Sequence, residues 1–123
     1  MVHKIVFLDR DTIAPHIDIR RPSFIHEWTE YDRTKAEDVK ERLKDATIAI
    51  TNKAPIRKAT LEKCQNLKMI AIAATGSDIV DVEACNKRGI IVSNIRGYAV
   101  NTVPEHTFAL ILSLKRALVG YRQ

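Results

Sequence analysis

The residues best suited to chemistry are Thr75, Gly76 and Ser77, which directly follow an apolar run at positions 70–74. A short apolar run closed by polar residues is typical of a buried strand, so these three residues are predicted to form the turn at its carboxyl end. Glycine lets a ligand approach the backbone closely, and consecutive amides can form an anion-binding nest. The turn is a candidate anion site, although its composition taken alone favours an ordinary strand-to-helix connection.

Glu105 and His106 are the other pair that invites a catalytic interpretation. Thr102 and Glu105, however, have the spacing of a helix capping box, and Pro104 is tolerated in a first helical turn. We interpret Glu105 as the capping acid and His106 as a residue that packs or hydrogen-bonds at a domain junction. No catalytic residue is therefore assigned to this chain.

The remaining reactive residue types lack the spacing of a metal or nucleotide site. Cys64 and Cys85 have no metal or redox spacing and are predicted to be buried or half-buried. Three histidines without a partner pattern are interpreted as surface or strand residues, namely His3, His16 and His26. No two glycines have the GxGxxG spacing of a nucleotide-binding turn among Gly76, Gly89, Gly97 and Gly120. The sequence predicts no metal site and no phosphate-binding turn.

Alternating elements are predicted to position these residues. We expect strands at 4–9, within 24–31, at 47–51, at 68–73 and ending at 94, and helices at 34–44, at 57–67, before Gly89 and from 102 onward. Thr34 and Glu37 match a capping box for the first of these helices. The alternation predicts an α/β fold, flavodoxin-like or Rossmann-like, with a parallel five-stranded sheet and helices on both faces.

The last helix carries apolar residues in nearly every direction around its axis, including Phe108, Leu110, Ile111, Leu112 and Leu114. Such a helix must be covered on all sides. One sheet covers one side, so a further domain or a second subunit is predicted to cover the rest. We expect residues 1–100 to form one domain, residues 101–123 to form an inter-domain helix, and positions 104–121 to mediate a homodimer or higher oligomer.

Composition excludes several classes of function. The net charge is +5, but the basic residues are scattered among acids and form no aromatic-interleaved patch, so nucleic-acid binding is not expected. The amino terminus has no signal-peptide pattern, and no apolar run approaches the length of a membrane span. A cytoplasmic protein without a membrane partner is the expectation.

Taken together, these motifs resemble the substrate-domain signature of the D-isomer-specific 2-hydroxyacid dehydrogenases. The matching residues, in order, are Thr75 to Asp78 with Asp81, Gly89 with Ile90, Asn94, Gly97 with Tyr98, and Val103 with Glu105 and His106. The opening segment 6–12 and the segment 50–53 look most like the glycerate dehydrogenase, or hydroxypyruvate reductase, branch. The resemblance covers essentially the whole chain, which stops before the family's cofactor domain begins.

The resemblance implies the roles of several residues. Lys53 and Ala54 would line the substrate pocket, and Gly76 and Ser77 would present amides to the substrate carboxylate. Thr75 and Gly76 match the positions that contact substrate and cofactor. Thr102 and Val103 would touch the cofactor at a hinge. The longer enzyme would use NAD or NADP on a 2-oxo or 2-hydroxy acid, with glycerate, hydroxypyruvate or glyoxylate expected. The family's catalytic Arg, Glu and His lie outside this chain, so the chain alone is expected to be inactive and to bind no cofactor tightly.

Two other interpretations stay open at this stage. A flavodoxin-like binding module, such as a receiver domain, would need an acidic cluster, which Asp9 and Asp11 could supply. It would also need an aspartate after the third strand, where the sequence instead has Thr51, Asn52 and Lys53. A non-catalytic relative that uses the fold for protein association is the other alternative.

Overall fold

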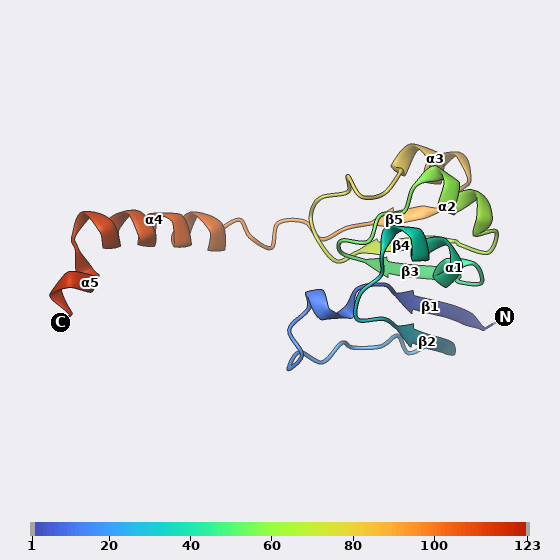
Figure 1. Cartoon of the computed structure of the whole chain (residues 1–123), viewed down its shortest axis with the longest axis horizontal. Helices are drawn as coiled ribbons and strands as arrows, with labels where there is room; N and C mark the ends of the chain where they lie inside the picture. Colours follow the sequence, from blue (N-terminus) through green and yellow to red (C-terminus); the bar gives the residue numbers. More distant parts are fainter. Residues whose placement is uncertain (1, 123) are drawn as a thin grey trace.

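A five-stranded parallel sheet with strand order β2-β1-β3-β4-β5 forms the centre of the molecule (Figure 1). The computed structural model describes residues 2–122. The strands are β1 (His3–Phe7), β2 (His26–Glu30), β3 (Ile48–Thr51), β4 (Met69–Ile72) and β5 (Ile91–Ser93). The helical segments are η1 (Arg10–Thr12), η2 (Ala36–Asp38), α1 (Val39–Leu43), α2 (Lys58–Lys63), α3 (Val82–Lys87), α4 (Thr102–Lys115) and α5 (Leu118–Tyr121). The predicted parallel α/β sheet is confirmed.

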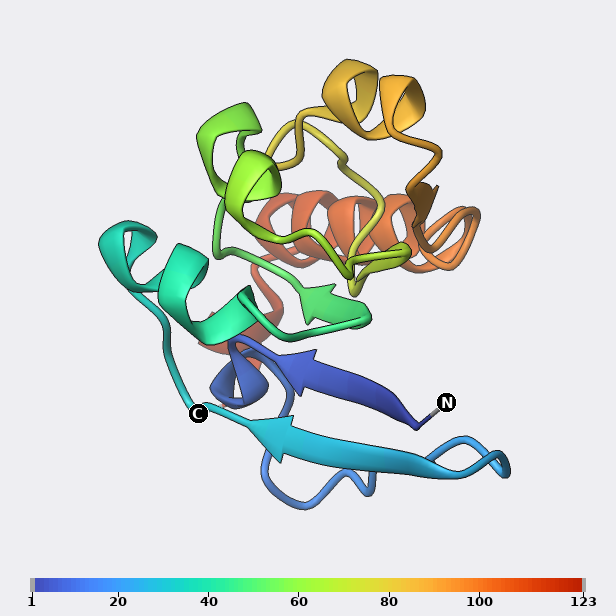
Figure 2. The ribbon, with the colours of Figure 1, turned by 90° about the vertical axis from the view of Figure 1, so that its right-hand side faces the viewer.

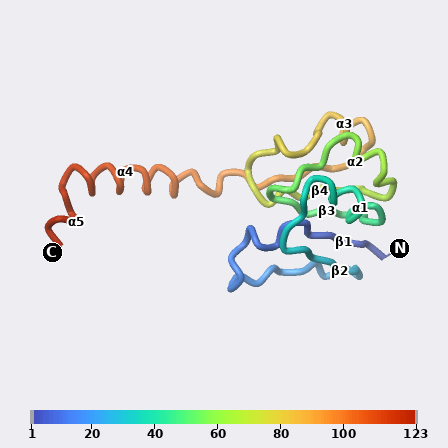
Figure 3. The backbone as a smooth tube through the Cα atoms, in the orientation of Figure 1, coloured from blue at the N-terminus to red at the C-terminus, as the bar shows by residue number. Residues whose placement is uncertain are grey.

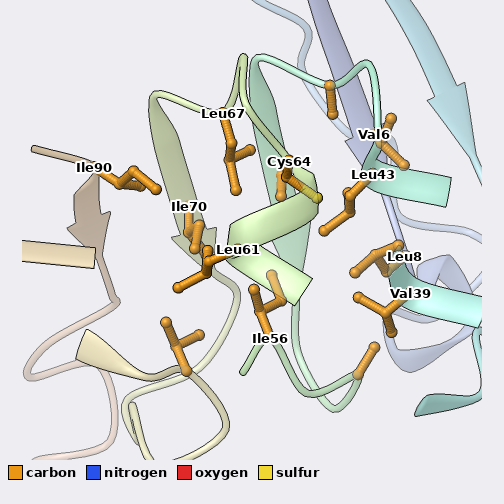
Figure 4. Close-up of a cluster of buried hydrophobic side chains, with 14 of the residues drawn as sticks. Val6, Leu8, Val39, Leu43, Ile56, Leu61, Cys64, Leu67, Ile70 and Ile90 are labelled. Carbon is orange, nitrogen blue, oxygen red and sulfur yellow. The ribbon is translucent and has the colours of Figure 1, made fainter. Parts of the chain in front are cut away.

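Alternate residues of the inner strands point into a single apolar core (Figure 4). The register aligns Val6 with Ala49 and Ala49 with Ile70, so one face of the sheet presents a continuous apolar surface. The helices pack Leu43 from α1, Leu61 from α2 and Cys85 from α3 against this surface. Burying a side chain such as leucine contributes roughly 1.5–3 kcal/mol, so this layer supplies much of the stability of the fold.

All three of these helices cover the same face of the sheet, so the prediction of helices on both faces is wrong (Figure 2). The strand order explains this arrangement. The connections from β2 to β3, β3 to β4 and β4 to β5 all run in one direction across the sheet, and right-handed crossovers in one direction lie on one face. The connection from β1 to β2 runs the other way. It carries Pro15 and Pro22, forms only η1, and packs Phe24 edge-on against His3.

The predicted capping boxes are also wrong. Thr34 Oγ1 donates to the carbonyl of Leu8 at 2.5 Å, and the helical region begins only at η2, whose N-cap makes no side-chain bond. Helix α4 likewise starts after Asn101 without a side-chain cap. Within residues 2–122, Asp81 does cap a helix, because its carboxylate accepts the Ala84 amide at 3.0 Å at the start of α3.

Helix α4 extends away from the sheet and from the three helices that cover it (Figure 3). None of its residues is buried, and its apolar side chains are exposed all round, from 50% for Ile111 to 83% for Leu114. The expected single helix over 104–121 is interrupted. Ala117 adopts a left-handed conformation with φ 50°, and α5 begins after it.

Candidate functional site

The loops that follow β1, β3, β4 and β5 meet at the carboxyl edge of the sheet, toward which all the strand arrows point in Figure 1. Ligands of open α/β sheets bind at this edge. Side chains tie the loops together: Asn94 Nδ2 donates to the Thr75 carbonyl at 2.7 Å, and Arg57 Nη1 donates to the Asp78 carbonyl at 2.7 Å. The candidate site is therefore built on cross-linked loops rather than on independent ones.

The turn after β4 presents free backbone donors. Thr75, Gly76 and Ser77 are exposed, and the amides of Gly76 and Ser77 have no hydrogen-bond acceptor within residues 2–122. The chain on either side is fixed, because the Ala73 amide donates to the Thr51 carbonyl at 2.8 Å and the Ile95 amide donates to the Ala74 carbonyl at 3.0 Å. Two neighbouring unpaired amides on a held backbone are suited to an anionic oxygen.

At Gly76 the space beside the backbone is limited, while its φ is not in the left-handed region. A Cβ at this position would lie 3.1 Å from Oδ1 of Asp78, which is tighter than ordinary van der Waals contact. The Asp78 carboxylate therefore lies beside the turn and opposes the binding of an anion there. The Arg57 guanidinium, which is held on the Asp78 carbonyl, supplies a compensating positive charge at the same place.

The loop after β3 places Lys53 and Ala54 differently. Ala54 is 3% exposed, its amide donates to Asp9, and its carbonyl accepts the Thr51 hydroxyl at 2.7 Å, so it has no free polar group for a substrate. Lys53 is exposed, and its ammonium has no ion pair within the described chain. Both residues line a cleft of about 420 Å³ that is also bordered by Asp9, Asp11, Thr12, Arg33, Thr34 and Pro55.

Thr102 and Val103 lie apart from these loops, in the first turn of α4. Both are exposed, and no hydrogen bond joins them to the turns after β3 or β4 in the described part of the chain. Glu105 and His106 are exposed on the same helix, and no hydrogen bond or ion pair joins them. The structure brings Lys53 and the turn at 75–77 to one edge and leaves Thr102 and Val103 on the connecting helix.

Other reactive groups show no sign of a catalytic or metal site. Among residues 2–122, no group of three histidine, cysteine or acidic side chains is arranged to hold a metal ion. Cys64 and Cys85 are free and buried, and desolvation by burial raises the pKa of each thiol. A raised pKa favours the unreactive protonated form. No helix in the described chain is long and apolar enough to cross a membrane.

Two residues that organise this edge are not predicted from the sequence. One is Asp9, and the other is Asn94, which donates to the Thr75 carbonyl. Asp9 is 4% exposed, and its carboxylate accepts the backbone amides of Asn52, Lys53 and Ala54. The sequence signal for Asp9 is a single acid at the carboxyl end of an inner strand, but the pattern places it only in the family-like segment 6–12 and in a possible acidic cluster. Asn94 was noted as a family position without a role.

Comparison with known proteins identifies the family. A model of the catalytic domain of D-isomer-specific 2-hydroxyacid dehydrogenases matches residues 8–118. The chain is 48% identical over 122 residues to glycerate dehydrogenase of Methylorubrum extorquens, covering 98% of this chain and 38% of that protein. It is 36% identical over 115 residues to hydroxypyruvate reductase of Blautia hydrogenotrophica, covering 90% of this chain and 36% of that protein.

A solved structure agrees with these sequence matches. The chain superimposes on NAD⁺-bound 3-phosphoglycerate dehydrogenase of Entamoeba histolytica with a TM-score of 0.71 and 27% identity, covering 92% of this chain and 39% of that one. The family resemblance seen in the sequence is thereby confirmed. The chain belongs to the D-isomer-specific 2-hydroxyacid dehydrogenase family and spans 38% and 36% of the lengths of the two relatives above.

Proposed function

We propose that residues 1–100 form the substrate-binding domain of an NAD(P)-dependent D-2-hydroxyacid dehydrogenase, and that residues 101–123 connect it to a cofactor domain. The proposed substrate is a small 2-oxo or 2-hydroxy acid, with hydroxypyruvate and glycerate favoured over glyoxylate by the names of the two relatives. Because the chain spans less than two fifths of those relatives, the reaction is proposed for a longer protein. The 123-residue chain alone is expected to be inactive.

The observation that carries this proposal is the pair of unpaired amides at Gly76 and Ser77. These two groups would bind the substrate carboxylate and so orient the adjacent carbon for hydride transfer. Lys53 lies on the neighbouring loop of the same edge, and its ammonium would add positive charge beside the bound anion. Preorganised donors of this kind hold a charged substrate without reorganisation during the reaction.

The nicotinamide cofactor, NAD or NADP, would supply or accept the hydride. The residues of this chain fit only its border, since the sequence has no glycine-rich turn for the phosphates. Thr75 would contact the cofactor from the β4 turn, where its side chain is exposed and its carbonyl is held by Asn94. Thr102 and Val103, exposed at the start of α4, would contact it from the connection between the domains.

A hybrid enzyme tests the proposal. Residues 1–123 replace the matched part of the Methylorubrum extorquens glycerate dehydrogenase, which supplies the remainder of the protein. We expect this hybrid to oxidise NADH in the presence of hydroxypyruvate and, more slowly, glyoxylate. Circular dichroism and NADH binding establish that the hybrid is folded. A folded, NADH-binding hybrid without turnover on any 2-oxo acid would refute the proposed function.

We also propose that the protein forms a homodimer through α4 and that it is cytoplasmic. The dimer is supported by the apolar side chains that α4 exposes on all sides. The cytoplasmic location is supported by two cysteines that are both free thiols.

The same exposed helix supports the alternative of a protein-association role, which an inactive hybrid would favour. A receiver domain is disfavoured, because the Asp9 carboxylate is occupied by three amides and Asp11 is paired with Arg33.

A further inference from the structure

Asp9 is the one buried carboxylate among residues 2–122. It follows β1 directly, and its side chain crosses to the loop after β3. Oδ1 accepts the Asn52 amide at 2.9 Å, and Oδ2 accepts the amides of Lys53 at 2.6 Å and Ala54 at 2.9 Å. A second, longer bond of 3.1 Å joins Oδ2 to the Asn52 amide. Three consecutive backbone donors therefore converge on one acidic side chain.

Three convergent amides form an anion-binding nest of the kind that binds phosphate or carboxylate ligands. Here the chain fills the nest with its own carboxylate. The loop amides are thereby turned inward, and the Lys53 side chain is left on the exposed side, at the cleft that Asp9 also borders. Unlike the amides of residues 52–54, those of Gly76 and Ser77 at the same edge have no acceptor within residues 2–122, so they are left for a dissolved anion.

We propose that Asp9 is a positioning residue for substrate binding, which occupies the nest at 52–54 and so directs the substrate carboxylate to the turn at 76–77. This inference rests on the proposed function for its second half. Its first half, the occupation of the nest, concerns this chain alone. Asp9 does not touch the substrate, and it acts through the backbone that carries Lys53.

Amide exchange in the ¹⁵N-labelled 123-residue chain tests the first half. In the unmodified chain we expect the amides of residues 52–54 to exchange about 100-fold more slowly than those of Gly76 and Ser77. Asp9→Ala should abolish most of that difference. Asp9→Asn keeps the shape and one acceptor oxygen, so it should give intermediate protection. Unchanged protection at 52–54 in a folded Asp9→Ala variant would overturn the proposal.

Chemical rescue separates a vacated anion site from general loosening. Formate has the size of the carboxylate that Asp9→Ala removes, and we expect it to restore protection at 52–54 and to shift those amide signals. Sodium chloride at the same ionic strength should do neither. Leu43→Ala, which removes a fully buried core side chain, is the matched control for lost stability. Loss of protection confined to 52–54 in this control as well would contradict a specific role for Asp9.

Kinetics in the hybrid enzyme test the second half. Asp9→Asn should raise KM for hydroxypyruvate about tenfold with a smaller change in kcat, since small displacements of positioning groups have large effects on rate and binding. Leu43→Ala should lower the melting temperature without raising KM. Lost protection with an unchanged KM would overturn the positioning role. An inactive parent hybrid would instead refute the proposed function, while the exchange data would still decide what Asp9 does to the loop.

Discussion

Placing charge on α4 should dissociate the proposed dimer into monomers. The double variant Ile111→Asp with Leu114→Asp changes two side chains that are 50% and 83% exposed in the isolated chain. Neither side chain contributes to the core beneath the sheet, so the change should leave the sheet domain folded. The variant therefore tests association through this helix with little effect on the rest of the molecule.

The magnitude follows from the exposed fraction of the helix. Phe108, Leu110 and Leu112 are exposed by 63%, 53% and 55%, in addition to the two mutated residues. At about 2 kcal/mol for complete burial of each such side chain, covering the five exposed portions contributes about 6 kcal/mol per chain, or about 12 kcal/mol per dimer. Association itself costs about 4–15 kcal/mol. With an association cost at the lower end of that range, about 8 kcal/mol remains, which corresponds to a dissociation constant of about 1 μM. Two buried charges would dissociate such a dimer.

Light scattering coupled to size exclusion measures the outcome. The unmodified chain at micromolar concentration should have a mass above 13.9 kDa, and the double variant should have the monomer mass. Asn66→Asp with Asn86→Asp adds the same two negative charges at exposed positions outside α4 and is the matched control. A monomeric unmodified chain whose α4 amides are nonetheless protected from exchange would show that this helix needs no cover, which would refute the reasoning.

Three further predictions concern activity and the backbone. The purified 123-residue chain should not consume NADH with hydroxypyruvate above background. Steady turnover in the absence of any longer enzyme would contradict the proposal that the reaction needs a separate cofactor domain. In the hybrid, Gly76→Val should raise KM for hydroxypyruvate clearly and lower the melting temperature only slightly, because its Cβ would lie 3.1 Å from the Asp78 carboxylate beside the proposed anion site. An unchanged KM would argue against that site. Ala117→Gly should slow amide exchange around the junction of α4 and α5 about fivefold, equivalent to about 1 kcal/mol, because glycine adopts the left-handed conformation without steric cost; an unchanged rate would show that the junction is not strained.

The strands were predictable from sequence because their signals are local. Runs such as positions 4–9 and 68–73 are largely apolar and are followed by polar residues. The structure places β4 within the second run, and β1, at His3–Phe7, overlaps the first and begins one residue before it. The distribution of helices between faces was not predictable in this way. It depends on the order of the strands in the sheet, and a pattern of alternating elements does not specify that order.

The predicted capping boxes are wrong for a related reason. Thr34 has the right residue type and spacing for a cap, but the Leu8 carbonyl, 26 residues earlier, takes its hydroxyl hydrogen bond. Arg42 also donates to the Thr34 hydroxyl at 2.8 Å. A capping box is a local rule, and here a tertiary partner competes successfully for the side chain. Asp81, which does cap α3, has no such competing partner within the described chain.

In the candidate site, too, local interactions are predictable from the sequence and distant ones are not. The turn at 75–77 is predictable because one short motif contains the strand end, the glycine and the amides. The role of Asp9 is not predictable in this way, because the amides that it binds lie 43 to 45 residues further along the chain. Its importance appears only when two parallel strands become neighbours and their carboxyl ends meet. The structure therefore adds a tertiary contact to the motif. At one edge of the sheet the amides of residues 52–54 are filled by an internal carboxylate, whereas those of Gly76 and Ser77 have no acceptor within residues 2–122 and would be open to the proposed substrate.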